Sequence, residues 1–256
     1  MIRVAVAGAA GRMGREVVKT VSAEDDLRLV GAFDVVSIGA DAGALANVAP
    51  CGVSVQTLNE TALGDAKPDV LVDFTAAPAA FDNARKAISL GISPVIGTTG
   101  MSDDEVALLS TLASDARVGA IYAPNFSIGA VLMMVLAGQA ARFLKSAEII
   151  ELHHDGKRDA PSGTAKLTAQ RIANAWGDPA SSSEGEIAPA RGGSINGIQV
   201  HSVRLPGLVA HQEVIFGGTG QILTIRHDSL DRSSFMPGVL MAIRRVRQLT
   251  GLTVGL

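Results

Sequence analysis

The chain has 256 residues, of which 47% are hydrophobic and 18% are charged, and its formal net charge is −3. This length and composition predict one large or two medium globular domains with an ample core, and they exclude a disordered chain. Lysine and arginine are scattered along the sequence, which excludes the basic surface that a nucleic-acid-binding protein needs. The single cysteine, Cys51, excludes an intrachain disulfide, and the first residues show no signal-peptide pattern, so we expect a cytoplasmic protein.

The first predicted element is an apolar strand from Ile2 to Ala7, which runs directly into a glycine-rich turn from Gly8 to Gly14. A helix with Val17, Val18 and Val21 at core spacing follows the turn. Glycines allow a tight turn and a close approach of the backbone to a pyrophosphate, which then faces the helix N-terminus. Strand, glycine turn and helix in this order indicate a dinucleotide-binding unit.

A carboxylate follows the second predicted strand. That strand runs from Leu29 to Phe33 and ends at Asp34, 20 residues after Gly14. A dinucleotide fold places at this point the carboxylate that accepts hydrogen bonds from the adenosine ribose. The alternative is a tight turn that binds no ligand.

Strands and helices continue to alternate up to residue 126. Buried strands are predicted at Val70 to Val72, Ile92 to Ile96 and Ala120 to Ala123, and a capping box at Ser102 starts one of the helices between them. This alternation predicts a parallel sheet, in which ligands bind beyond the carboxyl ends of the strands. The segments that follow such strand ends, and that we expect to line one crevice, are the glycine turn, Asp34, Phe74, Gly97 to Gly100 and Ala123 to Phe126.

The pattern changes after residue 126. A long apolar helix is predicted from Ile128 to Lys145, whose most apolar part is too short to span a bilayer. A polar loop from Asp178 to Gly193 and short β-rich runs from Ile195 to Asp228 follow, and an amphipathic helix from Ser233 to Leu249 is expected to return to the first domain. The predicted domains are therefore 1–126 with 232–256, and 127–231. A β-rich domain with an exposed apolar face predicts self-association.

The stretch with the most chemical groups runs from His153 to Thr164, between a predicted strand and a predicted helix. Its end, from Pro161 to Thr164, lies where a helix leaves its first amides unpaired, and such an end binds carboxylates. Two adjacent imidazoles titrate near neutrality, and Lys157 adds a positive charge. The stretch predicts a pocket that holds a carboxylate and moves a proton. The alternative is a polar surface loop.

We expect no metal at this stretch, because adjacent side chains leave a strand on opposite faces and no second Cys or His cluster completes a ligand set. The remaining histidines, His201, His211 and His227, lie in the β-rich runs, where a structural role is the stronger interpretation.

The loop, with His153-His154, Lys157 and the run from Asp159 to Ala165, resembles the signature of the 4-hydroxy-tetrahydrodipicolinate reductases, also called dihydrodipicolinate reductases. Gly8 to Gly14, Gly97 to Gly100 and Ala123 to Ser127 match the cofactor segments of the same family in order and at fitting distances. The resemblance implies an α/β fold: a Rossmann-type parallel sheet domain plus a second α+β domain whose mixed sheet is used for oligomerisation. It also implies a homotetramer.

The activity implied by the resemblance is the reduction of 4-hydroxy-tetrahydrodipicolinate, a cyclic imine dicarboxylate, in lysine and diaminopimelate biosynthesis. NADH or NADPH would be the cofactor, without a metal. His153 would be the acid/base residue and Lys157 a proton donor or carboxylate partner, while His154, Gly163 and Thr164 would bind the substrate. The residues implied to bind the cofactor are Gly8, Ala9, Ala10, Gly11, Arg12, Met13, Asp34, Phe74, Gly97, Thr98, Thr99, Ala123, Pro124, Asn125 and Phe126.

One departure concerns the cofactor: Val35 and Val36 follow Asp34, where some members of the family carry an arginine that can meet a 2′-phosphate. Two alternative functions stay open. One is another dehydrogenase on the same fold, such as an amino-acid or homoserine dehydrogenase. The other is a non-catalytic NAD-sensing protein, since a dinucleotide fold alone does not imply chemistry. A sensor has no need of His153 and Lys157 beside an anion-binding helix start.

Overall fold

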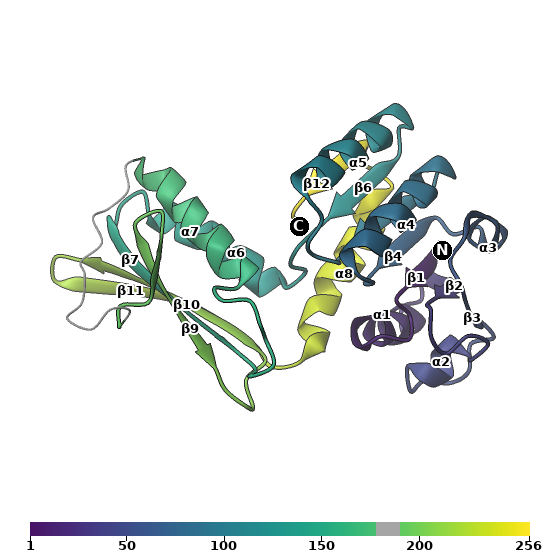
Figure 1. The fold of residues 1–256 in the computed structure, drawn as a ribbon, viewed down its shortest axis with the longest axis horizontal. Coiled ribbons are helices and arrows are strands. Elements are labelled where there is room, and N and C mark those ends of the chain that lie inside the picture. The colour runs from purple at the N-terminus through teal and green to yellow at the C-terminus, as the bar shows by residue number, and fades with distance from the viewer. Residues whose placement is uncertain (178–189) are drawn as a thin grey trace. The chain divides into compact units, whose positions relative to one another are not determined.

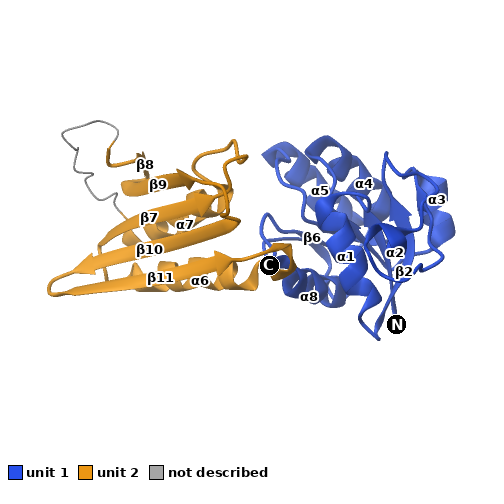
Figure 2. Ribbon diagram, turned by 90° about the horizontal axis from the view of Figure 1, so that it is seen from below, with its two compact units in different colours: residues 1–126, 235–256 blue, residues 127–234 orange. Residues whose placement is uncertain are grey.

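The structure is a computed structural model that describes residues 1–177 and 190–256. The chain divides into two compact units: unit 1 is Met1–Phe126 with Phe235–Leu256, and unit 2 is Ser127–Ser234 (Figure 2). Of the polar loop expected from Asp178 to Gly193, residues 178–189 lie outside the described residues.

Unit 1 is built on one parallel sheet in the order β12-β6-β5-β4-β1-β2-β3 (Figure 1). Its strands are β1 (Ile2–Ala7), β2 (Leu27–Phe33), β3 (Val55–Gln56), β4 (Val70–Asp73), β5 (Ser93–Ile96), β6 (Gly119–Tyr122) and β12 (Gly251–Val254). The chain crosses from one half of this doubly wound sheet to the other between β3 and β4, so β1 and β4 are neighbours and Ala7 pairs with Asp73. Ligands bind at such a switch point, beyond the carboxyl ends of the strands.

Helices cover both faces of this sheet because successive side chains of a buried strand point to opposite sides. Val4 and Val6 pack in one core cluster with α1 and α8, whereas Ala5 and Ala7 pack in another with α3. The helices of the first face are α1 (Arg12–Ser22), α2 (Ala42–Leu45) and α8 (Met236–Val246), and those of the second face are α3 (Glu60–Ala66), α4 (Ala77–Ser89) and α5 (Asp103–Asp115). The capping box expected at Ser102 is present at the start of α5.

Unit 2 contains a mixed sheet, whose described strands have the order β11-β10-β7-β9-β8 (Figure 2). Its elements are α6 (Ile128–Ala140), β7 (Ser146–His153), α7 (Gly163–Trp176), β8 (Gly193–Ile195), β9 (Ile198–Arg204), β10 (Ala210–Gly218) and β11 (Gln221–Ser229). β7 and β9 are parallel and the other neighbours are antiparallel. Both α6 and α7 pack on the face that carries Ile149, Val214 and Phe216. Alternate residues such as Ile150 and Ile215 point to the opposite face, which neither helix covers.

The parallel sheet followed by a mixed sheet confirms the predicted fold class. Two predicted helices were too long. The one expected to reach Lys145 ends at Ala140, because the next residues form a turn in which the N–H groups of Phe143 and Leu144 both donate to the Ala140 carbonyl at 3.0 Å. The one expected from Ser233 to Leu249 is only α8, because Arg232–Phe235 is a 3₁₀ turn. None of the described helices is long and apolar enough to cross a membrane.

Candidate active site

The glycine turn joins β1 to α1 at the switch point of the parallel sheet. The N–H groups of Gly8 and Ala9 both donate to the Phe33 carbonyl, at 2.8 and 3.1 Å, which ties the turn to the end of β2. A methyl group at Gly14 would lie 1.9 Å from the Gly8 carbonyl oxygen, and one at Gly8 would lie 2.6 Å from the Phe74 carbonyl oxygen. Only glycine fits at these two positions, so the turn can pack tightly against the segment after β4 and against its own next residues.

Asp34, which follows β2, is hydrogen-bonded to this turn. One carboxylate oxygen accepts a hydrogen bond from the Ala10 N–H at 2.9 Å, and the other accepts from the Val35 and Val36 N–H groups at 2.7 and 3.3 Å. The carboxylate is therefore fixed by backbone donors at the end of β2. Arg12 and Met13 begin α1; Arg12 is exposed and Met13 is half-buried.

A buried carboxylate that the sequence analysis missed lies next to the end of β1, where the turn begins. Asp73, at the end of β4, is 1% exposed. It accepts hydrogen bonds from Thr75 N–H (2.9 Å), Thr75 Oγ1 (2.7 Å), Thr98 Oγ1 (2.9 Å) and Asn83 Nδ2 (2.8 Å). Its backbone carbonyl accepts from the Gly97 N–H at 2.9 Å. Asp73 thus fixes the segments after β4 and β5 to each other. The available signal was a carboxylate at the end of an otherwise apolar strand, directly before Phe74.

Four of the predicted cofactor residues, Gly8, Gly11, Asp34 and Phe74, line one cavity of about 410 Å³ in unit 1. The cavity also includes Thr75 and Asn83, which the sequence analysis did not name. The other predicted residues border the turn or follow β5 and β6 and lie outside this lining: Ala9, Ala10, Arg12, Met13, Gly97, Thr98, Thr99, Ala123, Pro124, Asn125 and Phe126.

Phe126 connects the last of these segments to the cavity wall. Its ring packs against that of Phe74, with centroids 5.9 Å apart and planes tilted by 57°. Ala123 is tied to the end of β5, because its N–H donates to the Ile96 carbonyl at 3.0 Å. The segments after β1, β2, β4, β5 and β6 therefore meet at the same edge of the sheet.

In unit 2, the loop from His154 to Ser162 connects β7 to α7. Ser162 is the N-cap residue, since its hydroxyl accepts the Ala165 N–H at 3.2 Å. The helix expected after this loop is present, and it begins at Gly163, within the run where we expected unpaired amides. Gly163 is exposed, and a methyl group there would meet nothing within 4 Å, so a ligand can approach the first amides of α7. Thr164 follows and is half-buried.

His153 ends β7 and is oriented by a second carboxylate that the sequence analysis missed. Its Nδ1 lies 2.5 Å from an oxygen of Glu151, which is fully buried on the same face of the strand. Burial would raise the pKa of the Glu151 carboxyl, but hydrogen bonds from His153 and Arg204 outweigh it and lower that pKa from 4.5 to about 2. Glu151 is thus an ionised acceptor at neutral pH. The available signal was a glutamate two positions before a histidine in a strand, since such residues share a face.

Lys157 lies in the loop beyond His153. Its ammonium contacts both carboxylate oxygens of Asp159, at 2.7 and 2.9 Å, and these hydrogen bonds lower the pKa of Asp159. His154 is exposed on the same loop. The loop and the start of α7 together present an imidazole, an ammonium and backbone amides, which are groups that can bind a carboxylate and transfer a proton.

Comparison with known proteins decides the family. A family model described as dihydrodipicolinate reductase, N-terminus, matches residues 2–126, and one described as dihydrodipicolinate reductase, C-terminus, matches residues 129–255. The chain belongs to the dihydrodipicolinate reductase family. The resemblance inferred from the sequence is thereby confirmed.

Relatives of the dihydrodipicolinate reductase family match the whole chain. The 4-hydroxy-tetrahydrodipicolinate reductase of Moorella thermoacetica is 53% identical over 100% of this chain and 96% of its own length. That of Synechococcus elongatus is 49% identical over 100% and 97%. A solved structure described as dipicolinate-bound dihydrodipicolinate reductase from Paenisporosarcina sp. TG-14 is 44% identical, covers 100% of this chain and 98% of its own, and has a TM-score of 0.87.

The other three histidines of this reductase-family chain pair with neighbouring side chains. His201 Nε2 lies 2.8 Å from Glu148, His211 Nδ1 lies 2.7 Å from Asp228, and His227 Nε2 lies 3.0 Å from the Ser127 hydroxyl. Burial lowers the pKa of His227. Within the described residues, no three His, Cys, Asp or Glu side chains are grouped so that they could hold a metal ion.

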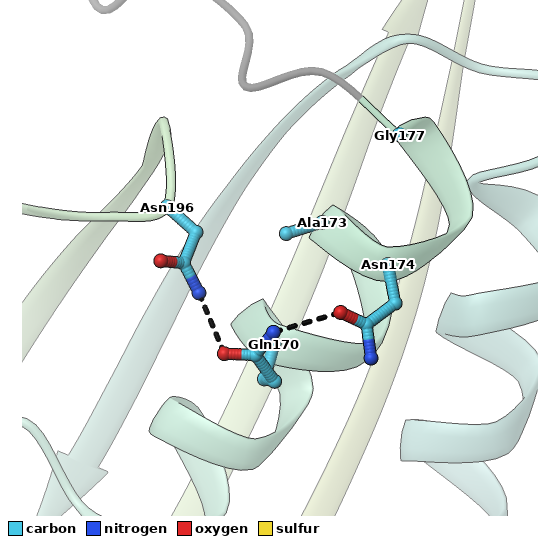
Figure 3. Close-up of a pocket in the computed structure, with 5 residues that line it drawn as sticks. All are labelled: Gln170, Ala173, Asn174, Gly177 and Asn196. Atoms are coloured by element: carbon cyan, nitrogen blue, oxygen red, sulfur yellow. Dashed lines mark hydrogen bonds between the residues drawn. The ribbon is translucent and has the colours of Figure 1, made fainter.

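A second cavity, of about 470 Å³, lies at the C-terminal end of α7 (Figure 3). Gln170 links two other amides there, donating to Asn174 at 2.7 Å and accepting from Asn196 at 2.8 Å. The described residues of the lining include no ionisable group, and Gln170 to Gly177 are at the opposite end of the helix from Ser162. These described residues offer no charged partner for a dicarboxylate, and we assign this cavity no part in the chemistry.

Proposed function

We propose that this chain catalyses the reduction of 4-hydroxy-tetrahydrodipicolinate to tetrahydrodipicolinate in lysine and diaminopimelate biosynthesis. In the balanced reaction, NAD(P)H and one proton are consumed with the substrate, and NAD(P)⁺ and water are released with the product. The observation that carries the proposal is the arrangement in unit 2: His153 ends β7, and Lys157 lies on the loop that connects it to the amides at the start of α7. The dipicolinate held by the Paenisporosarcina relative, a cyclic dicarboxylate, supports it.

Unit 1 fits a dinucleotide. Gly8 and Gly14 allow the tight turn into α1, and Gly8 and Gly11 line the cavity there, so a pyrophosphate could bind against the start of that helix. Asp34 is fixed where a ribose can donate to it, and the cavity beside it continues along Phe74 and Thr75. The remaining predicted cofactor residues would extend the site along the ends of β5 and β6. When bound, the nicotinamide cofactor supplies the hydride.

Unit 2 supplies the groups that act on the substrate. The amides of Gly163 and Thr164 would bind one carboxylate, since the helix end provides both donors and a favourable dipole. The Lys157 ammonium would leave Asp159 and contact the substrate instead, either as a proton donor or as the partner of a substrate carboxylate. His153 would act as the acid/base group, and the exposed His154 would contact the substrate. No metal ligand is needed for these steps.

We further propose that the chain works as a cytoplasmic homotetramer. The uncovered face of the mixed sheet carries Ile150, Leu152, Ile215 and Ile222, on strands β7, β10 and β11. Apolar side chains on an open sheet favour a self-complementary contact with a second copy.

The decisive experiment is an assay of NADH and NADPH oxidation with the purified chain, using the product of the preceding synthase as substrate. We expect loss of reduced cofactor that depends on both substrate and enzyme. No oxidation with either cofactor would overturn the proposal. If an amino acid and NAD⁺ gave reduced cofactor instead, the chain would be an amino-acid dehydrogenase; cofactor binding without any turnover would indicate an NAD sensor.

A further inference from the structure

Several donors surround the Glu151 carboxylate in the described part of the chain, namely His153, Arg204, the Ser162 N–H and the Ser202 side chain. One oxygen accepts from His153 Nδ1 at 2.5 Å and from Arg204 Nη1 at 2.9 Å. The other accepts from the Ser162 N–H at 3.2 Å and from Arg204 Nη2 at 2.7 Å. Arg204 therefore makes a bidentate contact with the carboxylate. Each oxygen also accepts one bond from the proposed active site, one from His153 and the other from the Ser162 N–H.

The first of these bonds decides which nitrogen of His153 carries a proton. An ionised carboxylate only accepts hydrogen bonds, so the ring nitrogen that faces Glu151 must be the protonated one. Nε2 of His153 has no hydrogen-bond partner among the described residues, and it is the nitrogen left to exchange a proton with a substrate. A carboxylate fixes a catalytic imidazole in the same way in Ser-His-Asp enzymes.

The second bond attaches Glu151 to the anion-binding end of α7. Ser162 caps that helix, so its backbone position determines where the Gly163 and Thr164 amides point. Arg204 strengthens this attachment, because its Nη2 also donates to the Asp159 carbonyl at 2.8 Å and so holds the loop before the cap. One buried carboxylate is therefore bonded both to the imidazole and to the residue before the first helical amides.

We propose that Glu151, held by Arg204, is the positioning residue of this site: it fixes the tautomer and orientation of His153 and holds the α7 cap at a set distance from that ring. The effect of Glu151 on catalysis rests on the proposed function. The geometric part of the inference concerns the folded chain alone, because His153 of β7, Arg204 of β9 and the Ser162 N–H meet at this carboxylate without a substrate. The position of the imidazole relative to the substrate carboxylate would then be determined by Glu151.

The same strand provides a matched control. Glu148 accepts from His201 Nε2 at 2.8 Å and forms an ion pair with Arg191. It lies three positions before Glu151, and residues an odd number apart in a strand point to opposite faces. Glu148 thus has the same kinds of partner as Glu151, away from the loop and from the start of α7.

The test compares Glu151→Gln with Glu148→Gln in the full-length chain, by steady-state kinetics and by ¹⁵N NMR of histidine-labelled protein. In the wild type we expect His153 as the tautomer protonated on Nδ1. Glutamine can donate as well as accept, so Glu151→Gln should populate both His153 tautomers and lower kcat about tenfold to a hundredfold. KM should rise less than kcat falls. Glu148→Gln should alter the ring signals of His201 alone and leave kcat within about twofold.

The outcomes separate this inference from the proposed function. A folded Glu151→Gln variant with unchanged His153 signals, or with kcat within about twofold of wild type, would overturn the positioning role. If the wild type reduced no substrate, the proposed function would fail, while the ring signals would still decide whether Glu151 orients His153. If Glu151→Gln did not fold, the double variant Glu151→Gln/Arg204→Gln, which removes both charges of the buried pair, takes its place with the same two readouts.

Discussion

The ring of Phe74 lies so close to the backbone of Gly97 that a methyl group on Gly97 would come within 2.2 Å of Phe74 Cε1. Phe74 follows β4 and Gly97 follows β5, so the contact joins two neighbouring strand ends at the edge where the cofactor is proposed to bind. Asp73 holds both segments from behind. The place of this ring in the cavity wall therefore depends on the absence of a side chain at residue 97.

Gly97→Ala should displace the Phe74 ring and weaken NADH binding. Forcing a methyl group into a packed site costs about 1–3 kcal/mol, so we expect Kd to rise about tenfold and the free energy of unfolding to fall by a similar energy. Fluorescence titration and urea unfolding measure the two effects. Gly64→Ala is the control: it lies inside α3 with nothing within 4 Å, and it should stabilise the chain by about 0.5–1 kcal/mol. Equal NADH binding by the two variants would contradict this account.

His153→Ala and Lys157→Ala should each lose turnover while the fold survives, because His153 is at the end of its strand and Lys157 is on a loop. Loss of a general acid or base costs about 10²- to 10⁴-fold in kcat. Circular dichroism checks the fold, and Lys145→Ala, which removes an ammonium near the C-terminal end of α7, should keep normal turnover. Near-normal turnover of both correctly folded loop variants would show that the roles are assigned wrongly.

The stability of the folded chain in acid should depend on the ionisation of the Glu151 carboxylate. The pKa of Glu151 is lower in the folded chain, about 2, than its ordinary value of 4.5. The contribution of the ionised Glu151 to the free energy of unfolding is therefore complete above pH 4.5 and is lost as the pH falls toward 2. The shift in pKa corresponds to about 3 kcal/mol of unfolding free energy. The difference in unfolding free energy between wild type and Glu151→Gln should shrink over this range. A difference that stayed constant or grew would contradict the low pKa.

The uncovered sheet face should mediate assembly. Ile222 is 76% exposed on β11 and pairs with Gly217 on that face, so Ile222→Glu should weaken a tetramer that light scattering detects in the wild type at micromolar concentration. Leu136→Glu is the control, since Leu136 is exposed on α6, which packs on the other face. A monomer mass for the wild type would refute the assembly, and equal masses for wild type and Ile222→Glu would exclude this face.

Local patterns were enough to predict the glycine turn, the strand that ends before Asp34, and the helix start that follows Pro161. The residues that carry each of these patterns are consecutive in the sequence. The short elements α2, β3, α3 and β12 were not predicted, because stretches this brief show no periodicity that sets them apart from loops.

Asp73 and Glu151 have hydrogen-bond partners that the local sequence does not reveal. Asp73 is satisfied by Thr98, 25 residues away, and Glu151 by Arg204, 53 residues away. A carboxylate in an apolar strand looks unfavourable until such distant donors are known, since burial without partners is costly. Tertiary pairing, and not local pattern, makes these two residues the supports of the candidate site.

NADH should be used at least as well as NADPH. The Asp34 carboxylate is held at the end of β2 by the Ala10 N–H, where it can accept from both hydroxyls of the NADH ribose. A 2′-phosphate at that place would meet a like charge, and Val35, 86% exposed, offers no cation to offset it. Repulsion between exposed charges a few ångströms apart is only about 1 kcal/mol in water, so the preference should be about tenfold or less.

The measurement is kcat/KM for both cofactors at low and at moderate salt, in wild type, Asp34→Asn and Arg12→Ala. Asp34→Asn removes the like charge and should shift the ratio toward NADPH. Arg12 is exposed at the start of α1 and forms no ion pair within the described part of the chain, so it could turn toward a phosphate, whereas the Arg15 guanidinium donates to the Ala10 carbonyl at 2.8 Å. Because screening weakens exposed charge pairs, any contribution from Arg12 should fade as salt rises. A clear NADPH preference that disappears in Arg12→Ala would show that the arginine, and not Asp34, decides the choice of cofactor.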